Sequence, residues 1–304
     1  MCRPVEIMVE IDAALVRRLI AAQFPHFAHL DVRPVVPGGW DNRTFRLGGD
    51  LAVRLPSTES HVAQVAKEHR WLPVLAPGLP LPVPVSLAVG VPGEGYPWPW
   101  SVRRWIGGET ADSGRVGDPV LLAQGLAGFL AALQDIDASD GPPAGAHNFH
   151  RGGSLAVYDD GTRAALEALR GEVDPAEALE VWDAALATSW QRTPVWVHGD
   201  VAAGNLLVRD GRLAAIIDFG CCGTGDPATD LVIAWTLLEG DARTAFRQAL
   251  ELDAATWARG RGWALWKALI TMADPPGGKP ALADAARLVV AEVLAEHRRE
   301  DARR

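Results

Sequence analysis

Residues 195–208 read V-W-V-H-G-D-V-A-A-G-N-L-L-V, residues 213–220 read L-A-A-I-I-D-F-G, and residues 225–231 read G-D-P-A-T-D-L. The apolar starts of the first two segments predict short strands. Asp210-Gly211 between them is a dipeptide that favours a tight hairpin turn. Each predicted strand is followed by polar side chains on a loop. This arrangement is more informative about function than any other part of the chain.

Three polar residues in these segments suit the transfer of a phosphoryl group. The reaction needs a group that orients the acceptor hydroxyl and receives its proton, and it needs Mg²⁺ to neutralise the phosphate charges. Asp200 offers a carboxylate for the first task. Asn205 offers an amide oxygen and Asp218 a second carboxylate, and we expect the hairpin to bring these two side by side. Hard oxygen ligands of this kind suit Mg²⁺.

The order and the spacing of these residues match two elements of protein kinases. His198-Gly199-Asp200 stands where protein kinases have H-R-D, Asp200 and Asn205 have the spacing D-x-x-x-x-N, and Asp218-Phe219-Gly220 is D-F-G itself. Each motif alone is a weak signal, because short polar patterns occur by chance. Together, in this order and one short hairpin apart, they indicate a kinase.

Glycine in the middle of H-G-D, followed by G-D-P-x-x-D-L, resembles the aminoglycoside phosphotransferase family, whose superfamily includes choline, homoserine, methylthioribose and macrolide kinases. The resemblance implies a two-lobed protein-kinase-like fold, ATP or GTP with Mg²⁺, and phosphorylation of a hydroxyl on a small molecule. It also implies that Asp230 braces the catalytic loop and that His198 is a buried orienter of it. Gly199 replaces the arginine that, in regulated protein kinases, pairs with a phosphate on the activation loop. The chain between Gly220 and Asp226 is also too short to form such a loop.

The N-terminal half supplies candidates for a clamp on the nucleotide. Protein kinases carry a lysine on the third strand, paired with a glutamate on the following helix. The matching strand here, residues 51–55, presents Arg54 instead, and arginine can bind phosphate through two N–H groups. Glu68 on the predicted helix is the expected partner. Lys67 is the alternative cation, on the helix rather than the strand, and Glu59 is the alternative acid, at a position more typical of a helix cap.

Two further segments are expected to contact the nucleotide. Residues 37–44 read P-G-G-W-D-N-R-T, and the candidates there are Gly38, Gly39 and Asn42. Glycines let backbone N–H groups approach phosphate oxygens. The linker at residues 104–107 is expected to offer backbone groups of Trp105 and Ile106 to adenine or guanine.

The elements around these motifs predict an α+β chain with strands first and helices later. We expect a small lobe at residues 1–106, with an antiparallel β-sheet and one helix, and a larger, mostly helical lobe at residues 107–304. Asp118-Pro119 and Asp226-Pro227 are predicted helix starts, because Asp caps well and Pro suits the first turn. The predicted strands are 32–36, 44–47, 51–55, 83–89 and 98–106, and the predicted helices are 58–75, 119–136, 175–190 and 228–238.

The composition excludes several classes of protein. A net charge of −9 argues against binding to nucleic acid, which needs a basic face, and it is compatible with a cationic small molecule. No run of about 18 apolar residues predicts a membrane span. Residues 1–12 lack the pattern of a signal peptide, so we expect a cytoplasmic protein. Three cysteines, two of them adjacent, fit neither a disulfide framework nor a zinc motif. No protein partner is evident.

The sequence therefore predicts an O-phosphotransferase that moves the γ-phosphoryl group of ATP or GTP to a hydroxyl of a small molecule, with an aminoglycoside-type antibiotic as the favoured acceptor. A metabolic kinase of the same fold, acting on choline, a sugar or a homoserine-like compound, is the first alternative. A catalytically dead binding module is the second, and the intact Asp200, Asn205 and Asp218 argue against it. No motif identifies the acceptor. The acidic residues that suit a polyamine, and equally a solvated helix face, are Asp159, Asp160, Glu167 and Glu172.

Overall fold

The computed structural model describes residues 10–36, 38–39, 41–113 and 115–302, and the contacts along the chain define two compact units. Unit 1 comprises Met1–Gly108 and Ala215–Gly220, and unit 2 comprises Glu109–Ala214 and Cys221–Arg304. The sequence prediction placed residues 215–220 with the second lobe, whereas the structure groups them with unit 1. Contacts within unit 1 explain this difference, because the Ile216 N–H donates to the Pro82 carbonyl at 3.3 Å and Asp218 accepts from Arg54.

Unit 1 contains a five-stranded antiparallel sheet with the strand order β1-β2-β3-β5-β4. All five strands overlap predicted ones. Two of them begin later than predicted, because Pro84 and Pro99 have no N–H group to donate to a strand ladder. The strands are β1 Val32–Pro34, β2 Asn42–Leu47, β3 Leu51–Pro56, β4 Ser86–Gly90 and β5 Trp100–Arg104.

Alternation along β3 and β5 gives this sheet one apolar and one polar face. Val53 points to one side of the sheet and Arg54 to the other. In the ladder, Arg54 lies opposite Ser101 and Ala52 lies opposite Arg103. Both arginines therefore share the polar face, although they are on different strands.

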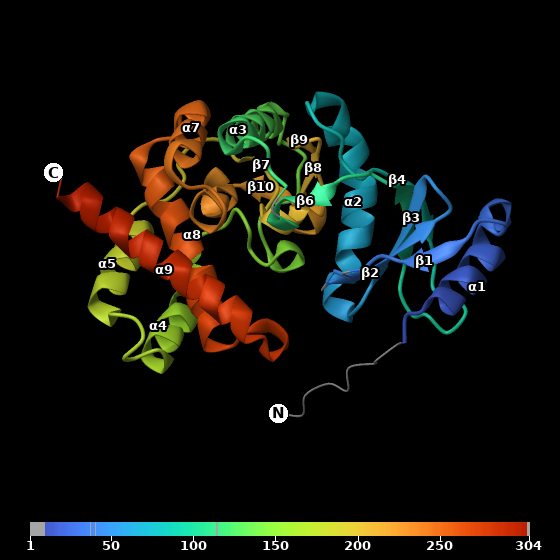
Figure 1. Ribbon diagram of the computed structural model, residues 1–304, viewed down its shortest axis with the longest axis horizontal. Coiled ribbons are helices and arrows are strands. Elements are labelled where there is room, and N and C mark those ends of the chain that lie inside the picture. Colours follow the sequence, from blue (N-terminus) through green and yellow to red (C-terminus); the bar gives the residue numbers. More distant parts are fainter. Residues whose placement is uncertain (1–9, 37, 40, 114, 303–304) are drawn as a thin grey trace. The chain divides into compact units, whose positions relative to one another are not determined.

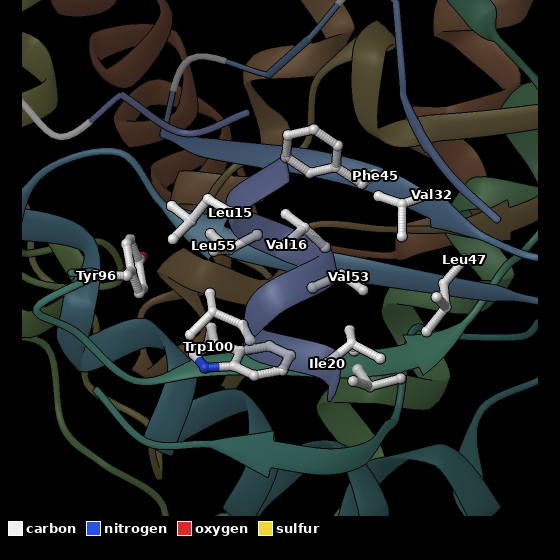
Figure 2. Packing of buried hydrophobic residues seen from close by; sticks show 12 residues of the cluster. Leu15, Val16, Ile20, Val32, Phe45, Leu47, Val53, Leu55, Tyr96 and Trp100 are labelled. Carbon is white, nitrogen blue, oxygen red and sulfur yellow. The ribbon is translucent and has the colours of Figure 1, made fainter. Parts of the chain in front are cut away.

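Helix α1, Ala13–Gln23, covers the apolar face, and Figure 2 shows its side chains packed against those of the strands. The Asp12 carboxylate accepts from the Leu15 N–H at 2.7 Å and caps the helix. The sequence prediction missed this helix, although its apolar residues recur at helical spacing. The core contains Leu15, Val16, Leu19, Ile20, Val32, Phe45, Leu47, Val53, Leu55, Tyr96, Trp100 and Val102.

Helix α2, Val62–Leu75, carries the residues that meet the polar face. A 3-10 helix at Glu59–His61 precedes it, so the predicted helix 58–75 begins with a tighter turn. Lys67 and Glu68 are both buried on α2. Charged residues are rarely buried without a partner, so the position of Glu68 indicates an ion pair inside unit 1.

Unit 2 is mostly helical, and α8 (orange in Figure 1) packs against α4, α5 and α9. Helix α3 begins as predicted, since Asp118 accepts from the backbone N–H groups of Val120 and Leu121. The predicted helix 228–238 is instead a 3-10 helix, Pro227–Val232, that leads into α6. The helices are α3 Pro119–Asp135, α4 Asp159–Ala168, α5 Pro175–Leu186, α6 Ile233–Thr236, α7 Gly240–Leu250, α8 Ala254–Ala273 and α9 Pro280–Asp301.

Short strands surround the informative motifs. β7 Val195–Val197 pairs antiparallel with β10 Gly223–Gly225, and β6 Glu109–Thr110 pairs with β8 Leu206–Arg209. β8 continues into β9, Arg212–Ile216, through Asp210 and Gly211, whose φ angles are 50° and 75°. Positive φ at both central residues is typical of a two-residue hairpin turn, so the predicted turn is confirmed. Across the described residues, none of the helices combines the length and the apolar composition that a membrane span requires.

Leu19→Ala is expected to destabilise unit 1. Leu19 is buried between α1 and the sheet, and the cavity left by a truncated core leucine costs about 2–5 kcal/mol. Leu87→Ala on β4, where the side chain is 46% exposed, is the matched control. Urea unfolding followed by tryptophan fluorescence compares the two variants. Equal unfolding midpoints would contradict the role of α1 in the core.

Candidate active site

Arg54 on β3 is the centre of a charged cluster in unit 1. Its Nη1 donates to Glu68 Oε1 at 2.9 Å and to Oε2 at 3.3 Å, and its Nη2 donates to Asp218 Oδ1. The Asn42 amide oxygen faces Arg54 Nε and Nη2 at 3.1 and 2.8 Å, in the amide orientation that satisfies both groups. Arg54 is only 8% exposed. Burial opposes the charged form, but Asp218 and Glu68 outweigh it and raise the pKa of Arg54.

Glu68 is shared by two arginines, one of which the sequence analysis did not identify. Arg103 on β5 donates from Nη2 to Glu68 Oε2 at 3.1 Å and to Ser101 Oγ at 2.9 Å. Burial raises the pKa of Glu68, but Arg54 and Arg103 together bring that pKa below its usual value. Burial lowers the pKa of Arg103. The strand register that places Arg103 beside Arg54 is a long-range property, so the local sequence around Arg103 gave no sign of it.

Asp218 follows β9 in an uncommon backbone conformation. Its φ is 66°, a region that non-glycine residues rarely adopt and that costs about 1–3 kcal/mol. Its side chain is 34% exposed, so part of the carboxylate remains accessible beside Arg54. Gly220 lies close to α2, because a Cβ atom there would come within 2.6 Å of the end of the Gln64 side chain, which would have to shift. The D-F-G motif therefore combines a strained aspartate with a glycine that lets α2 approach.

The other predicted nucleotide contacts are in the loop before β2 and in the segment that follows β5. Gly38 and Gly39 are exposed, and Pro37 and Trp40 of the same loop lie outside the described residues. Trp105 is half-buried and stacks under the Arg46 guanidinium, with 4.3 Å between the guanidinium carbon and the ring centroid. The Trp105 N–H donates to the Asp50 carbonyl at 2.8 Å, so this donor is already used within the unit. Ile106 is half-buried, and its contact with a nucleobase stays a prediction.

In unit 2, a buried carboxylate holds the loop between β7 and the following 3-10 turn. Asp230 Oδ2 accepts from the His198 N–H at 2.8 Å, and Asp230 Oδ1 accepts from the Gly199 N–H at 2.7 Å. Burial raises the pKa of Asp230, and His198 and the two backbone donors oppose this effect. The Asp200 N–H donates to His198 Nδ1 at 3.2 Å. Asp230 and His198 therefore orient the loop, as the family resemblance implied.

Asp226, four residues before Asp230, has a second role besides the predicted one of starting a helix. Its Oδ1 caps the 3-10 helix by accepting from the Ala228 N–H at 3.0 Å. Its Oδ2 accepts from Arg259 Nε at 2.6 Å, and both side chains are buried. Asp226 thus ties the start of this helix to α8.

The backbone at Gly199 explains why this loop has glycine where protein kinases have arginine. Its φ is 82°, and a Cβ atom at this position would lie 2.3 Å from the Cys221 carbonyl oxygen. Any side chain would therefore clash with backbone.

Asp200 is held by one partner on each carboxylate oxygen. Lys267 Nζ on α8 donates to Oδ1 at 2.9 Å, and Asn205 Nδ2 donates to Oδ2 at 3.3 Å and to the Asp200 carbonyl at 2.9 Å. Burial raises the pKa of Asp200, but Lys267, and then Arg151 and His198, bring it below its usual value. Asp200 is therefore an ionised carboxylate that can orient a hydroxyl. The sequence analysis missed Lys267, which lies outside every motif.

The structure brings the predicted residues together in two sets. Arg54, Glu68, Asn42 and Asp218 meet within unit 1, and Asp200 meets Asn205 within unit 2. Asn205 and Asp218, the predicted metal ligands, belong to different units, and each is described in its own unit.

The acidic residues considered for a polyamine acceptor are mostly paired with arginines of unit 2. Asp159 accepts from Arg163 Nε at 2.8 Å, Glu167 accepts from Arg170 Nε at 2.6 Å, and Glu172 accepts from Arg287 Nη2 at 2.9 Å. These contacts favour the interpretation of a solvated surface, on α4 for Asp159 and Glu167 and in the turn that follows α4 for Glu172.

Gly199→Ala is expected to lower stability and to displace the catalytic loop. A side chain at positive φ is strained, and the new methyl group would force the loop away from the Cys221 carbonyl. We expect a loss of about 1–3 kcal/mol. Gly161→Ala within α4, where a Cβ atom would meet no heavy atom within 4 Å, is the matched control and should be neutral or stabilising. Thermal unfolding measures both, and a Gly199→Ala melting temperature equal to that of the wild type would contradict this interpretation.

Comparisons with known proteins agree with this geometry. A family model described as "Phosphotransferase enzyme family" matches residues 32–263. The GDP and kanamycin complex of APH(2'')-IIIa is similar in structure, with a TM-score of 0.71 at 19% identity over 92% of this chain and 98% of that one. The apoenzyme of a macrolide 2'-phosphotransferase from Brachybacterium faecium has a TM-score of 0.60 at 22% identity, covering 92% and 97% of the two chains. These likenesses confirm the predicted two-lobed protein-kinase-like fold.

A local sequence match adds to the comparison. An aminoglycoside 3'-phosphotransferase from Escherichia coli is 41% identical to this chain over 46 residues. That segment is 15% of this chain and 17% of the relative's length. It therefore describes a shared stretch rather than a shared whole protein.

Proposed function

Because the chain belongs to the phosphotransferase enzyme family, we propose that it transfers the γ-phosphoryl group of ATP or GTP to a hydroxyl of a small molecule, with an aminoglycoside-type antibiotic as the acceptor. The observation that carries the proposal is the state of Asp200. Its carboxylate is ionised, partly exposed and fixed on both oxygens, on a loop that Asp230 braces. Such a carboxylate can accept a hydrogen bond from an acceptor hydroxyl and direct its oxygen toward a phosphorus atom.

The reaction balances with the groups that the proposal names. The acceptor oxygen forms a bond to the γ-phosphorus, and the bond from this phosphorus to the bridging oxygen breaks. The electron pair of that bond leaves with the nucleoside diphosphate, and the hydroxyl proton passes to Asp200. Positioning and charge stabilisation carry most of the catalysis in such reactions, which fits a carboxylate whose pKa is lowered rather than raised.

Unit 1 is proposed to bind the nucleotide. Arg54 is charged and preset by Glu68, so it can contact phosphate oxygens without first being ordered. Gly38 and Gly39 are exposed, and because glycine has no side chain, their backbone N–H groups can approach phosphate oxygens. Asn42 is proposed to contribute to this clamp by holding Arg54, whose guanidinium its amide oxygen faces. Trp105 and Ile106 are proposed to border the nucleobase.

Asn205 of unit 2 and Asp218 of unit 1 are proposed as the protein residues that would hold Mg²⁺. The chemistry of the donors fits. Asn205 uses its NH₂ group on Asp200, which leaves its amide oxygen for a cation, and Asp218 keeps a partly exposed carboxylate. The described residues contain no cluster of three His, Cys, Asp or Glu side chains suited to a metal, but Mg²⁺ typically takes one or two protein carboxylates together with water and phosphate oxygens. When bound, the ion would neutralise charge on the phosphates.

The acceptor class rests on similarity and on charge. The APH(2'')-IIIa structure contains kanamycin with GDP, and the local relative is named as an aminoglycoside phosphotransferase. A net charge of −9 also favours the approach of a polycationic antibiotic.

A turnover screen tests the proposal. Purified protein is incubated with ATP or GTP and Mg²⁺ against aminoglycosides, macrolides, choline and simple sugars, and nucleoside diphosphate release is measured. We expect turnover with aminoglycosides. We also expect Asp200→Asn to lower kcat by about 10²–10⁴-fold, because the amide cannot take the hydroxyl proton. Asp210→Asn in the hairpin turn is the matched control, since asparagine tolerates positive φ.

Different outcomes contradict different parts of the proposal. Turnover only with choline or sugars would overturn the acceptor class and leave the phosphotransferase activity. Near wild-type turnover by Asp200→Asn would overturn the role of Asp200.

A further inference from the structure

We propose that Lys267 is a further catalytic residue, which contacts the phosphoryl group as it passes to the acceptor hydroxyl oriented by Asp200. This inference rests on the proposed function. Lys267 lies on α8, 67 residues along the chain from Asp200, and its Nζ donates to Asp200 Oδ1 at 2.9 Å. The side chains of Lys267 and Asp200 are 39% and 33% exposed. A small molecule can therefore reach both members of the pair.

The choice of lysine at this position is informative. The chain has 29 Lys and Arg residues in total, and only three of them, Lys67, Lys267 and Lys279, are lysines. An arginine fork tends to engage both oxygens of a carboxylate. The ammonium group contacts one oxygen of Asp200 and has two more N–H donors that can bind another oxygen.

The charge on the transferred group gives this ammonium a role. The three outer oxygens of the phosphoryl group carry negative charge during transfer. The ionised carboxylate of Asp200 must approach the same acceptor oxygen and repels that charge. Lys267, one hydrogen bond from Asp200, offsets the repulsion and offers donors to the phosphoryl oxygens. It takes no proton from the substrate, so the balance of the reaction is unchanged.

The environment of Lys267 argues against a purely structural role. Ion pairs with partners this exposed contribute little to stability. The apolar residues Trp263, Leu265 and Leu269 of the same helix are buried and hold α8 in unit 2. Removing the ammonium should therefore leave the fold intact and affect the reaction.

Steady-state kinetics of Lys267→Met and Lys267→Arg test the proposal, with the acceptor found by the turnover screen. Lys279→Met, an exposed lysine at the start of α9, is the matched control. We expect Lys267→Met to lower kcat about 10²-fold or more while the KM for nucleotide and the melting temperature stay near wild-type values. Lys267→Arg should recover part of kcat, because the charge is kept. A Lys267→Met variant with wild-type kcat would overturn this inference and leave the phosphotransferase function standing.

A second measurement needs no acceptor. ADP and Mg²⁺ with aluminium fluoride mimic the phosphoryl group in transfer, and calorimetry compares this combination with ADP and Mg²⁺ alone. Wild-type protein should bind the mimic more tightly than ADP, and Lys267→Met should lose this gain while binding ADP equally well. An equal gain in both proteins would overturn the role of Lys267. If the wild type neither transfers phosphate nor binds nucleotide, the proposed function fails, and this inference fails with it.

Discussion

The buried contact between Arg54 and Glu68 is the interaction on which unit 1 depends. A charged group loses its hydration when it is buried, so it persists there only if fixed partners replace the water. Arg54 has three such partners, Glu68 on α2, Asn42 on β2 and Asp218 after β9, and Glu68 has a second arginine in Arg103. Breaking a buried pair on one side typically costs about 3–5 kcal/mol. The cluster therefore ties three strands, a helix and the distant segment 215–220 to one point.

Unit 2 also has a buried charged group with fixed partners, the carboxylate of Asp230. Asp230 is fully buried, and its two oxygens accept from consecutive backbone N–H groups of the loop that ends at Asp200. This contact fixes the backbone, Gly199 allows the tight turn, and Lys267 fixes the carboxylate of Asp200. The loop is therefore preorganised by one buried acid and one partly exposed base. In both units, a buried acid orients the residues of the candidate site: Glu68 holds Arg54, and Asp230 holds the loop that ends at Asp200.

Local patterns in the sequence carried much of this account. The family, the enzyme class and the fold follow from the motifs at residues 198–231, and they are confirmed. The hairpin turn at Asp210-Gly211 and the Arg54–Glu68 pair were also predictable, because turn chemistry and the strand-to-helix spacing are local or follow a known kinase pattern.

Long-range contacts could not be predicted in the same way. Arg103 meets Glu68 through the register of β3 and β5, and Lys267 meets Asp200 across 67 residues of chain. Helix α1 was not predicted, although its buried residues recur at helical spacing, which is a local signal. The most direct test of the central claim is a double-mutant cycle on Arg54→Met and Glu68→Gln, with the affinity for ATP or GTP and Mg²⁺ measured by calorimetry. If the two residues act as one preset clamp, each single change should weaken binding by about tenfold or more, and the double variant should be little weaker than either one. Strictly additive losses, or wild-type protein that binds neither nucleotide at millimolar concentration, would contradict the account.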